Sequence, residues 1–131
     1  MEKIRYPTID DIIEINKNVL QEIKVKKADR SALALSGKRM LEKIIEDMKN
    51  KKGGTFDKAV VLLKGVIKSH AFASGNRRTA LVATVSFLEV NDKKLNISHD
   101  ISIFQGIRES YYTDDEIKKW LKGGKIHEFK R

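Results

Sequence analysis

The sequence contains no cysteine, which excludes disulfide bonds and metal sites built from thiolates. It also lacks any apolar run long enough to cross a bilayer. Its start, M-E-K-I-R-Y-P, has no apolar core of the kind found in signal peptides. We therefore expect a soluble, cytoplasmic protein that does not bind membranes.

Histidine is scarce, with three residues in the whole chain. His99 and His127 have no companion at the spacing of a metal site, so we interpret both as surface or structural residues. His70 stands at the end of an apolar segment, beside a Gly-Asn pair. A histidine in such a place is on its own more often structural than catalytic. His70 is a candidate catalytic residue only because of its neighbours in the sequence.

Acidic residues are outnumbered by basic ones. Lysine and arginine total 27 residues against 18 aspartates and glutamates, which gives a net charge of +9. A surface with such an excess attracts anions. Nucleotides, nucleic acids and acidic partner proteins would all fit it.

Helical periodicity dominates the chain, which at 131 residues can bury a core without covalent cross-links. Two capping pairs, Thr8 with Asp11 and Thr113 with Glu116, indicate where the first and last helices begin. The segments expected to be helical are about 8–20, 36–48, 56–70, 79–88, 101–110 and 113–121. A short extended piece is expected over 94–98. We predict an all-α fold: a compact bundle of about six helices in one domain, residues 1–131.

The segment from Thr79 to Leu88 is predicted to be the buried central helix of this bundle. Its polar residues are only Thr79, Thr84 and Ser86, which are all small. A helix that is apolar nearly all round belongs in the middle of a domain.

The residues just before this helix suggest a phosphate site. His70 follows Leu63 and Ile67 at helical spacing, so its side chain is predicted to point inward. Gly75 and Asn76 suit a loop. The next helix begins with unpaired N–H groups and the positive end of its dipole, which favour an anion. Arg77 and Arg78 lie on that first turn and indicate a bound phosphate, because two like charges there need something negative to offset them.

This segment resembles the central motif of the Fic/Doc family, H-x-F-x-D/E-G-N-x-R-x-x-R. The match holds at five positions: His70, Phe72, Gly75, Asn76 and Arg78. The resemblance implies that His70 is the catalytic base and that Phe72 anchors the loop in the core. It also implies that the loop binds the phosphates of ATP through Ser74, Gly75, Asn76, Arg77 and Arg78.

Two positions depart from the motif. Leu81 replaces the final arginine, which is similar to the Doc (death on curing) branch, whose members transfer the γ-phosphate of ATP rather than AMP. Ser74 replaces the acid that normally binds magnesium. Because Mg²⁺ prefers carboxylate and phosphate oxygens, we assign no metal ligand and expect any Mg²⁺ binding to be weakened.

The resemblance implies a transferase that moves a phosphoryl group (Doc-type) or AMP (Fic-type) to a Ser or Thr hydroxyl of a target protein. A translation elongation factor is one candidate target. In that branch the chain would be the toxin of a toxin–antitoxin pair, with an antitoxin protein as partner. Two alternatives stay open: a catalytically weakened Fic-fold protein that binds a nucleotide or a partner, and a nucleic-acid-binding helical domain. The net charge and the basic helix near Trp120 support the last, but many basic proteins bind no nucleic acid.

The basic segment from Lys24 to Ser31 has two interpretations. In the family, a flap in the corresponding region aligns an extended piece of the target protein by main-chain pairing. A plain solvated loop explains the sequence equally well.

Overall fold

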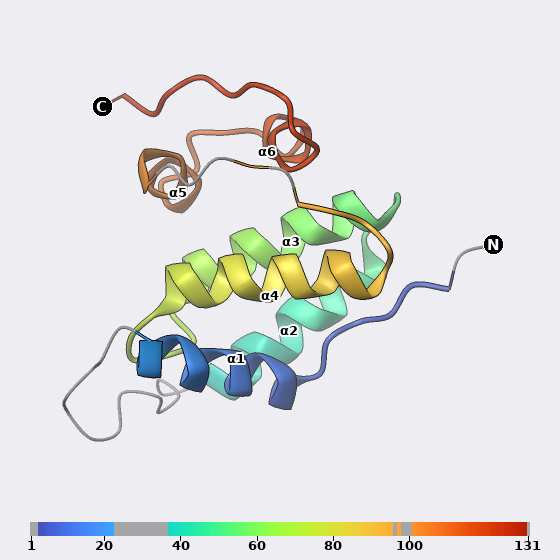
Figure 1. The fold of residues 1–131 in the computed structure, drawn as a ribbon, viewed down its shortest axis with the longest axis vertical. Helices are drawn as coiled ribbons and strands as arrows, with labels where there is room; N and C mark the ends of the chain where they lie inside the picture. Colours follow the sequence, from blue (N-terminus) through green and yellow to red (C-terminus); the bar gives the residue numbers. More distant parts are fainter. Residues whose placement is uncertain (1–2, 23–36, 96, 98–100, 131) are drawn as a thin grey trace.

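In the computed structural model, residues 3–22, 37–95, 97 and 101–130 are described, and this part of the chain forms six helices (Figure 1). The helices are α1 (Ile9–Glu22), α2 (Gly37–Asn50), α3 (Thr55–Ser69), α4 (Asn76–Val90), α5 (Ile101–Arg108) and α6 (Asp114–Leu121). The predicted all-α fold of about six helices is confirmed. None of these helices is long and apolar enough to cross a bilayer.

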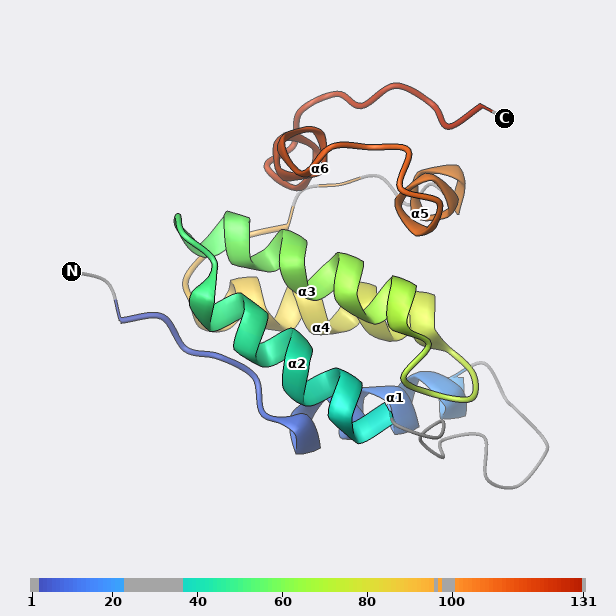
Figure 2. The same ribbon diagram turned by 180° about the vertical axis from the view of Figure 1, so that it is seen from behind.

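The long helices α3 and α4 run alongside each other in the middle of the molecule. Figures 1 and 2 show α1 and α2 on one side of this pair and α5 and α6 on the other. α3 packs against α2, α4, α5 and α6, whereas the main neighbours of α4 are α3 and α1. The core is therefore organised by two helices rather than by α4 alone.

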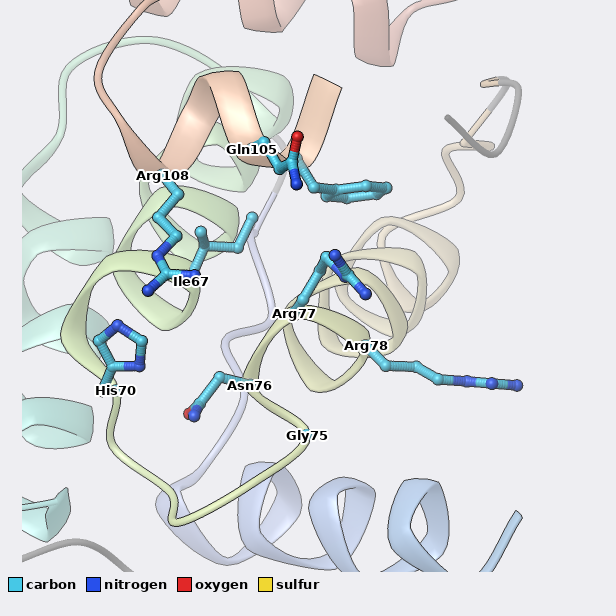
Figure 3. Close-up of a pocket in the computed structure, with 9 residues that line it drawn as sticks. Ile67, His70, Gly75, Asn76, Arg77, Arg78, Gln105 and Arg108 are labelled. Atoms are coloured by element: carbon cyan, nitrogen blue, oxygen red, sulfur yellow. The ribbon is translucent and has the colours of Figure 1, made fainter. Parts of the chain in front are cut away.

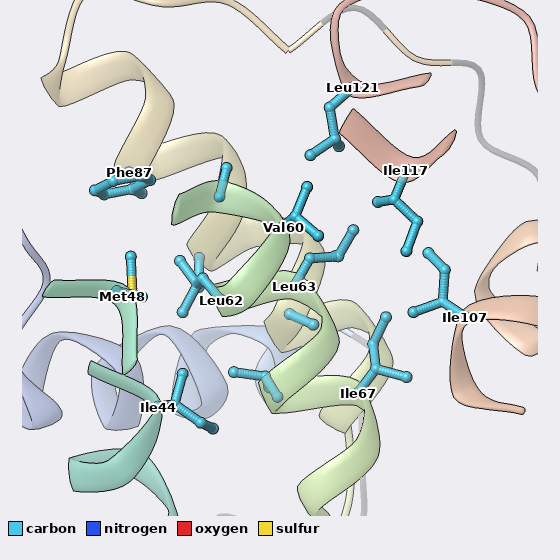
Figure 4. Packing of buried hydrophobic residues seen from close by; sticks show 14 of the residues in the cluster. Ile44, Met48, Val60, Leu62, Leu63, Ile67, Phe87, Ile107, Ile117 and Leu121 are labelled. Carbon is cyan, nitrogen blue, oxygen red and sulfur yellow. The ribbon is translucent and has the colours of Figure 1, made fainter. Parts of the chain in front are cut away.

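The burial of side chains on α3 and α4 agrees with the apolar character of their sequences. No side chain between Thr79 and Leu88 is exposed, so the prediction of a buried α4 is confirmed. On α3, apolar side chains face both ways (Figure 4). Leu62 lies toward Met48 of α2, and Ile67 lies toward Ile107 of α5. One continuous cluster of buried side chains thus includes members from all six helices.

The first and last helices begin as their capping pairs predict. The backbone N–H of Thr8 donates to Asp11 Oδ2 at 2.9 Å, and the N–H of Asp11 donates to Thr8 Oγ1 at 3.1 Å. At α6, Thr113 and Glu116 exchange the same two bonds at 2.9 and 3.2 Å. These bonds satisfy N–H groups that have no partner within the helix.

Two other sequence-based expectations have different outcomes. The segment from Lys24 to Ser31 lies outside the described residues, so the flap stays a prediction. In the predicted extended piece, residues 94, 95 and 97 are described, and they form no regular secondary structure.

A buried lysine joins α3 to the end of α2. Lys58 is 6% exposed, and its Nζ donates to the carbonyl oxygens of Met48 at 2.9 Å and Lys51 at 2.7 Å. The ring of Tyr6 lies 5.7 Å from the same ammonium. The charge is stable there because it faces the carbonyl end of a helix and an aromatic face.

Replacing this buried lysine should lower the stability of the fold more than replacing an exposed lysine. We expect Lys58→Met to lower the free energy of unfolding by about 2 kcal/mol, because the carbonyls of Met48 and Lys51 lose their donor. Lys52→Met is the matched control, since Lys52 is exposed, and should change stability by less than about 0.5 kcal/mol. Urea unfolding of both variants measures the difference, and equal losses would contradict the role of Lys58.

Candidate active site

The chain leaves α3 through a left-handed residue. Helix α3 ends at Ser69, and His70 follows with φ 50° and ψ 46°. For a residue other than glycine this conformation costs about 1 to 2 kcal/mol. It turns the chain out of the helix, and the side chain of His70 is exposed. The prediction that His70 points inward is therefore wrong, because helical spacing applies only while the helix continues.

The loop after His70 is fixed to the core by its apolar residues. Ala71 is fully buried, and Phe72 is 2% exposed within the main hydrophobic cluster. The backbone on either side of these residues consequently has little freedom to move.

Asn76 closes the loop through its side chain. Its Oδ1 accepts the backbone N–H of Phe72 at 3.0 Å, and its Nδ2 donates to the carbonyl oxygen of Phe72 at 2.9 Å. Asn76 is also the first residue of α4. One side chain therefore holds the loop in the shape that starts the next helix.

A second asparagine, which the sequence analysis did not identify, ties the loop to α1. Asn16 is fully buried, and its Nδ2 donates to the carbonyl oxygen of Ser74 and to Thr79 Oγ1, both at 3.0 Å. Its place on the apolar face of α1, four residues after Ile12 and four before Leu20, was the signal available in the sequence. A buried polar residue on such a face needs a partner from elsewhere in the fold.

Gly75 is required where the loop meets α1. It has φ 77°, and a Cβ there would lie 3.2 Å from Leu20 Cδ2 and 3.4 Å from Asn16 Nδ2. Gly75 is also the N-cap of α4, and it brings no side chain to the first N–H groups of that helix. In an α-helix the first N–H groups have no partner within the helix, so the start of a helix favours an acceptor from outside it.

An open pocket of about 480 Å³ lies beside this loop (Figure 3). We call it the arginine pocket. Its lining residues are Ile67, His70, Gly75, Asn76, Arg77, Arg78, Phe104, Gln105 and Arg108. Five of the predicted site residues thus lie around one space. Ser74 and Phe72 are not among the lining residues, and α5 adds three that the sequence analysis did not assign.

The described residues that line the arginine pocket carry positive charge only. Three arginines line it together with His70, and in this part of the chain no carboxylate is among the lining residues. In Figure 3 the side chains of Arg108 and Asn76 point toward His70, whereas Arg78 extends away from it. Guanidinium groups remain protonated at all ordinary pH values and pair well with phosphate oxygens. The pocket therefore suits an anion.

The residues present do not fit a magnesium ion. In the described ranges no three His, Asp or Glu side chains come together in a way that could hold a metal. Ser74 offers a neutral hydroxyl, and the carbonyl oxygen of the same residue already accepts a hydrogen bond from Asn16. Mg²⁺ is bound in proteins mainly by carboxylates together with phosphates and water, and this pocket supplies arginines instead.

Comparison with known proteins agrees with this geometry. The model of the Fic/DOC family matches residues 6–88, which include α1 and the whole loop between α3 and α4. The chain belongs to the Fic/DOC family. It is 33% identical over 60 residues to the "Toxin Doc" of Mycolicibacterium smegmatis (strain ATCC 700084 / mc(2)155). That match covers 46% of this chain and 46% of the relative, so the chain spans about half of that protein. The predicted resemblance to the family and its Doc branch is confirmed.

The loop geometry gives a direct stability prediction. Asn76→Ala should lower the free energy of unfolding by about 2 kcal/mol, because the N–H and the carbonyl of Phe72 each lose a partner. Asn50→Ala is the matched control, since Asn50 is exposed at the end of α2 and its loss should be below about 0.5 kcal/mol. Urea unfolding of both variants measures the two losses of stability. A loss at Asn76 no larger than at Asn50 would show that the loop does not depend on its amide.

Proposed function

We propose that this chain is a Fic/Doc transferase that moves the γ-phosphoryl group of ATP to a Ser or Thr hydroxyl of a target protein. The observation that carries the proposal is the shared pocket of His70 and the N-terminus of α4. A base for the hydroxyl and a helix end that binds phosphate are two of the elements that such a transfer uses.

The phosphate side of the reaction would use the first turn of α4. Its N–H groups and dipole favour a negative group, and Arg77 and Arg78 lie on the same turn. Arginine forms charge-assisted hydrogen bonds with phosphate oxygens. These residues would hold the nucleotide and offset charge on the transferred group.

The acceptor side would use His70. Its exposed position, which the sequence analysis did not foresee, leaves the imidazole accessible to a side chain of another protein. In the step proposed, neutral His70 takes the proton of the Ser or Thr hydroxyl while the hydroxyl oxygen bonds to the γ-phosphorus. The bond from that phosphorus to the bridging oxygen breaks, and ADP leaves with the electron pair. In the Fic-type variant the α-phosphorus is attacked and pyrophosphate leaves.

Leu81 and the similarity to a protein named Toxin Doc favour the phosphoryl form and a toxin role. A protein of net charge +9 would pair well with an acidic antitoxin. A translation elongation factor remains the candidate target that the family suggests. Both the antitoxin and the target protein are proposed because of the resemblance to the family.

A second candidate function is supported by Ser74. A Fic-fold protein without an acid at this position could bind a nucleotide and not turn it over. Both candidates predict nucleotide binding, and only the transferase predicts labelling of a protein substrate.

Two histidine variants test the transferase directly. His70→Ala should reduce transfer by about 10²- to 10⁴-fold, because the hydroxyl loses its base. His127→Ala is the matched control, since His127 lies on the surface and pairs with Glu116 at 3.4 Å outside the arginine pocket. Its rate should stay within about twofold of the original chain.

The assay uses ATP labelled at either the γ- or the α-phosphate, with elongation factor and cell-extract proteins as acceptors. Label from the γ-position on protein supports phosphoryl transfer, and label from the α-position supports AMP transfer instead. A His70→Ala chain as active as the original would remove His70 from the mechanism. ATP binding with no labelled protein would favour the second candidate.

A further inference from the structure

We infer that the arginine pocket binds a polyphosphate without a divalent cation, and that Arg108 of α5 is one of the residues that bind it. This inference rests on the proposed function. It identifies the arginines as the groups that balance the negative charge of the nucleotide in the pocket. It concerns α5, which lies beyond the residues that match the family model.

Arg108 is placed at the pocket by the packing of α5. Ile103 and Ile107 are buried in the core, while Gln105 and Arg108, three residues apart, lie on the other face and line the pocket. Phe104 is 3% exposed, and its ring meets that of Trp120 at 5.8 Å, which fixes the helix against α6.

The end of α5 is also held against α3. Lys68 of α3 contacts the hydroxyl of Ser110, just after the last turn of α5. The N–H of Tyr111 donates to the carbonyl oxygen of Gly106 at 2.9 Å, which closes that turn. Arg108 therefore stands on a fixed element next to the end of α3, and its side chain points toward His70 (Figure 3).

The charges define what the pocket can accept. Arg77 and Arg78 come from α4, and Arg108 adds a third guanidinium from α5. None of the described residues that line the pocket is a carboxylate. A divalent cation near the guanidinium groups of Arg77 and Arg108 would be repelled, whereas a polyphosphate would be attracted to them.

The side chain of residue 74 brings no metal-binding acid to the loop beside the pocket. In the family motif an acid stands there, and in this chain Ser74 brings no charge. Among the described residues that line the pocket, none is a carboxylate with which the polyphosphate could share a cation. The negative charge of the polyphosphate is instead offset by the arginines.

Calorimetric titration of inorganic triphosphate into the full chain tests this inference, once with EDTA and once with Mg²⁺. We expect binding in EDTA, and weaker binding with Mg²⁺ because the metal neutralises the anion. Arg108→Gln should weaken binding in EDTA by about tenfold or more, the loss of one charge-assisted contact. Arg108→Lys keeps the charge and should recover part of the loss.

Arg5→Gln is the matched control because it removes the same charge from an exposed arginine that lines a different hollow. It should change the affinity by less than about twofold. Thermal unfolding shows whether each variant is folded, which we expect because both side chains are exposed. In Ser74→Asp the metal effect should reverse, so that Mg²⁺ strengthens binding.

The outcomes separate this inference from the proposed function. Binding that requires Mg²⁺ in the original chain would overturn the inference and leave the transferase proposal standing. Equal losses in Arg108→Gln and Arg5→Gln would overturn the role of Arg108, because they would reflect overall charge alone. No binding of triphosphate under either condition would overturn the inference and remove the phosphate site on which the proposed function depends.

Discussion

The amide of Asn16 is the contact on which the candidate site depends most. It is fully buried in α1 and donates to Ser74 in the loop and to Thr79 in α4. With Asn76 bonded to Phe72, the loop is held from two directions, by a helix far away in sequence and by its own first helical residue. A buried amide that loses its partners costs about 1 to 3 kcal/mol, so this arrangement resists distortion. The uncapped start of α4 and His70 therefore stay beside the same pocket.

The structure of the loop also explains why the motif residues have different roles. Asn76 and Phe72 shape the loop, since one closes it and the other lies in the core. His70 and Arg77 line the open pocket, where they can meet a ligand. Replacing the acid of the motif by Ser74 leaves this scaffold intact, because the bond from Asn16 goes to the carbonyl of residue 74. The shape of the loop therefore does not depend on an acid at residue 74.

Much of the fold and part of the site could be predicted from the sequence. The periodicity of apolar residues located the helices, and the capping pairs at Thr8 and Thr113 located two helix starts. The motif predicted that His70 and Gly75 belong to one site, and both line the arginine pocket. The rest depends on tertiary structure. The pattern of α1 shows that Asn16 is buried but not that it reaches residue 74, and nothing local indicates that Arg108 folds back onto the pocket. The exposure of His70 follows from one left-handed residue, which helical spacing cannot reveal.

The proposed polyphosphate site lies at the start of α4, between the loop and α5. Amide ¹H–¹⁵N spectra of the full chain, recorded while inorganic triphosphate is added in EDTA, test this residue by residue. The largest shifts should fall on the N–H groups of Asn76, Arg77 and Arg78, together with the guanidinium Nε–H of Arg108, because these groups line the arginine pocket. The largest shifts at the hollow lined by Arg5 and Val90, with the start of α4 unchanged, would contradict the claim.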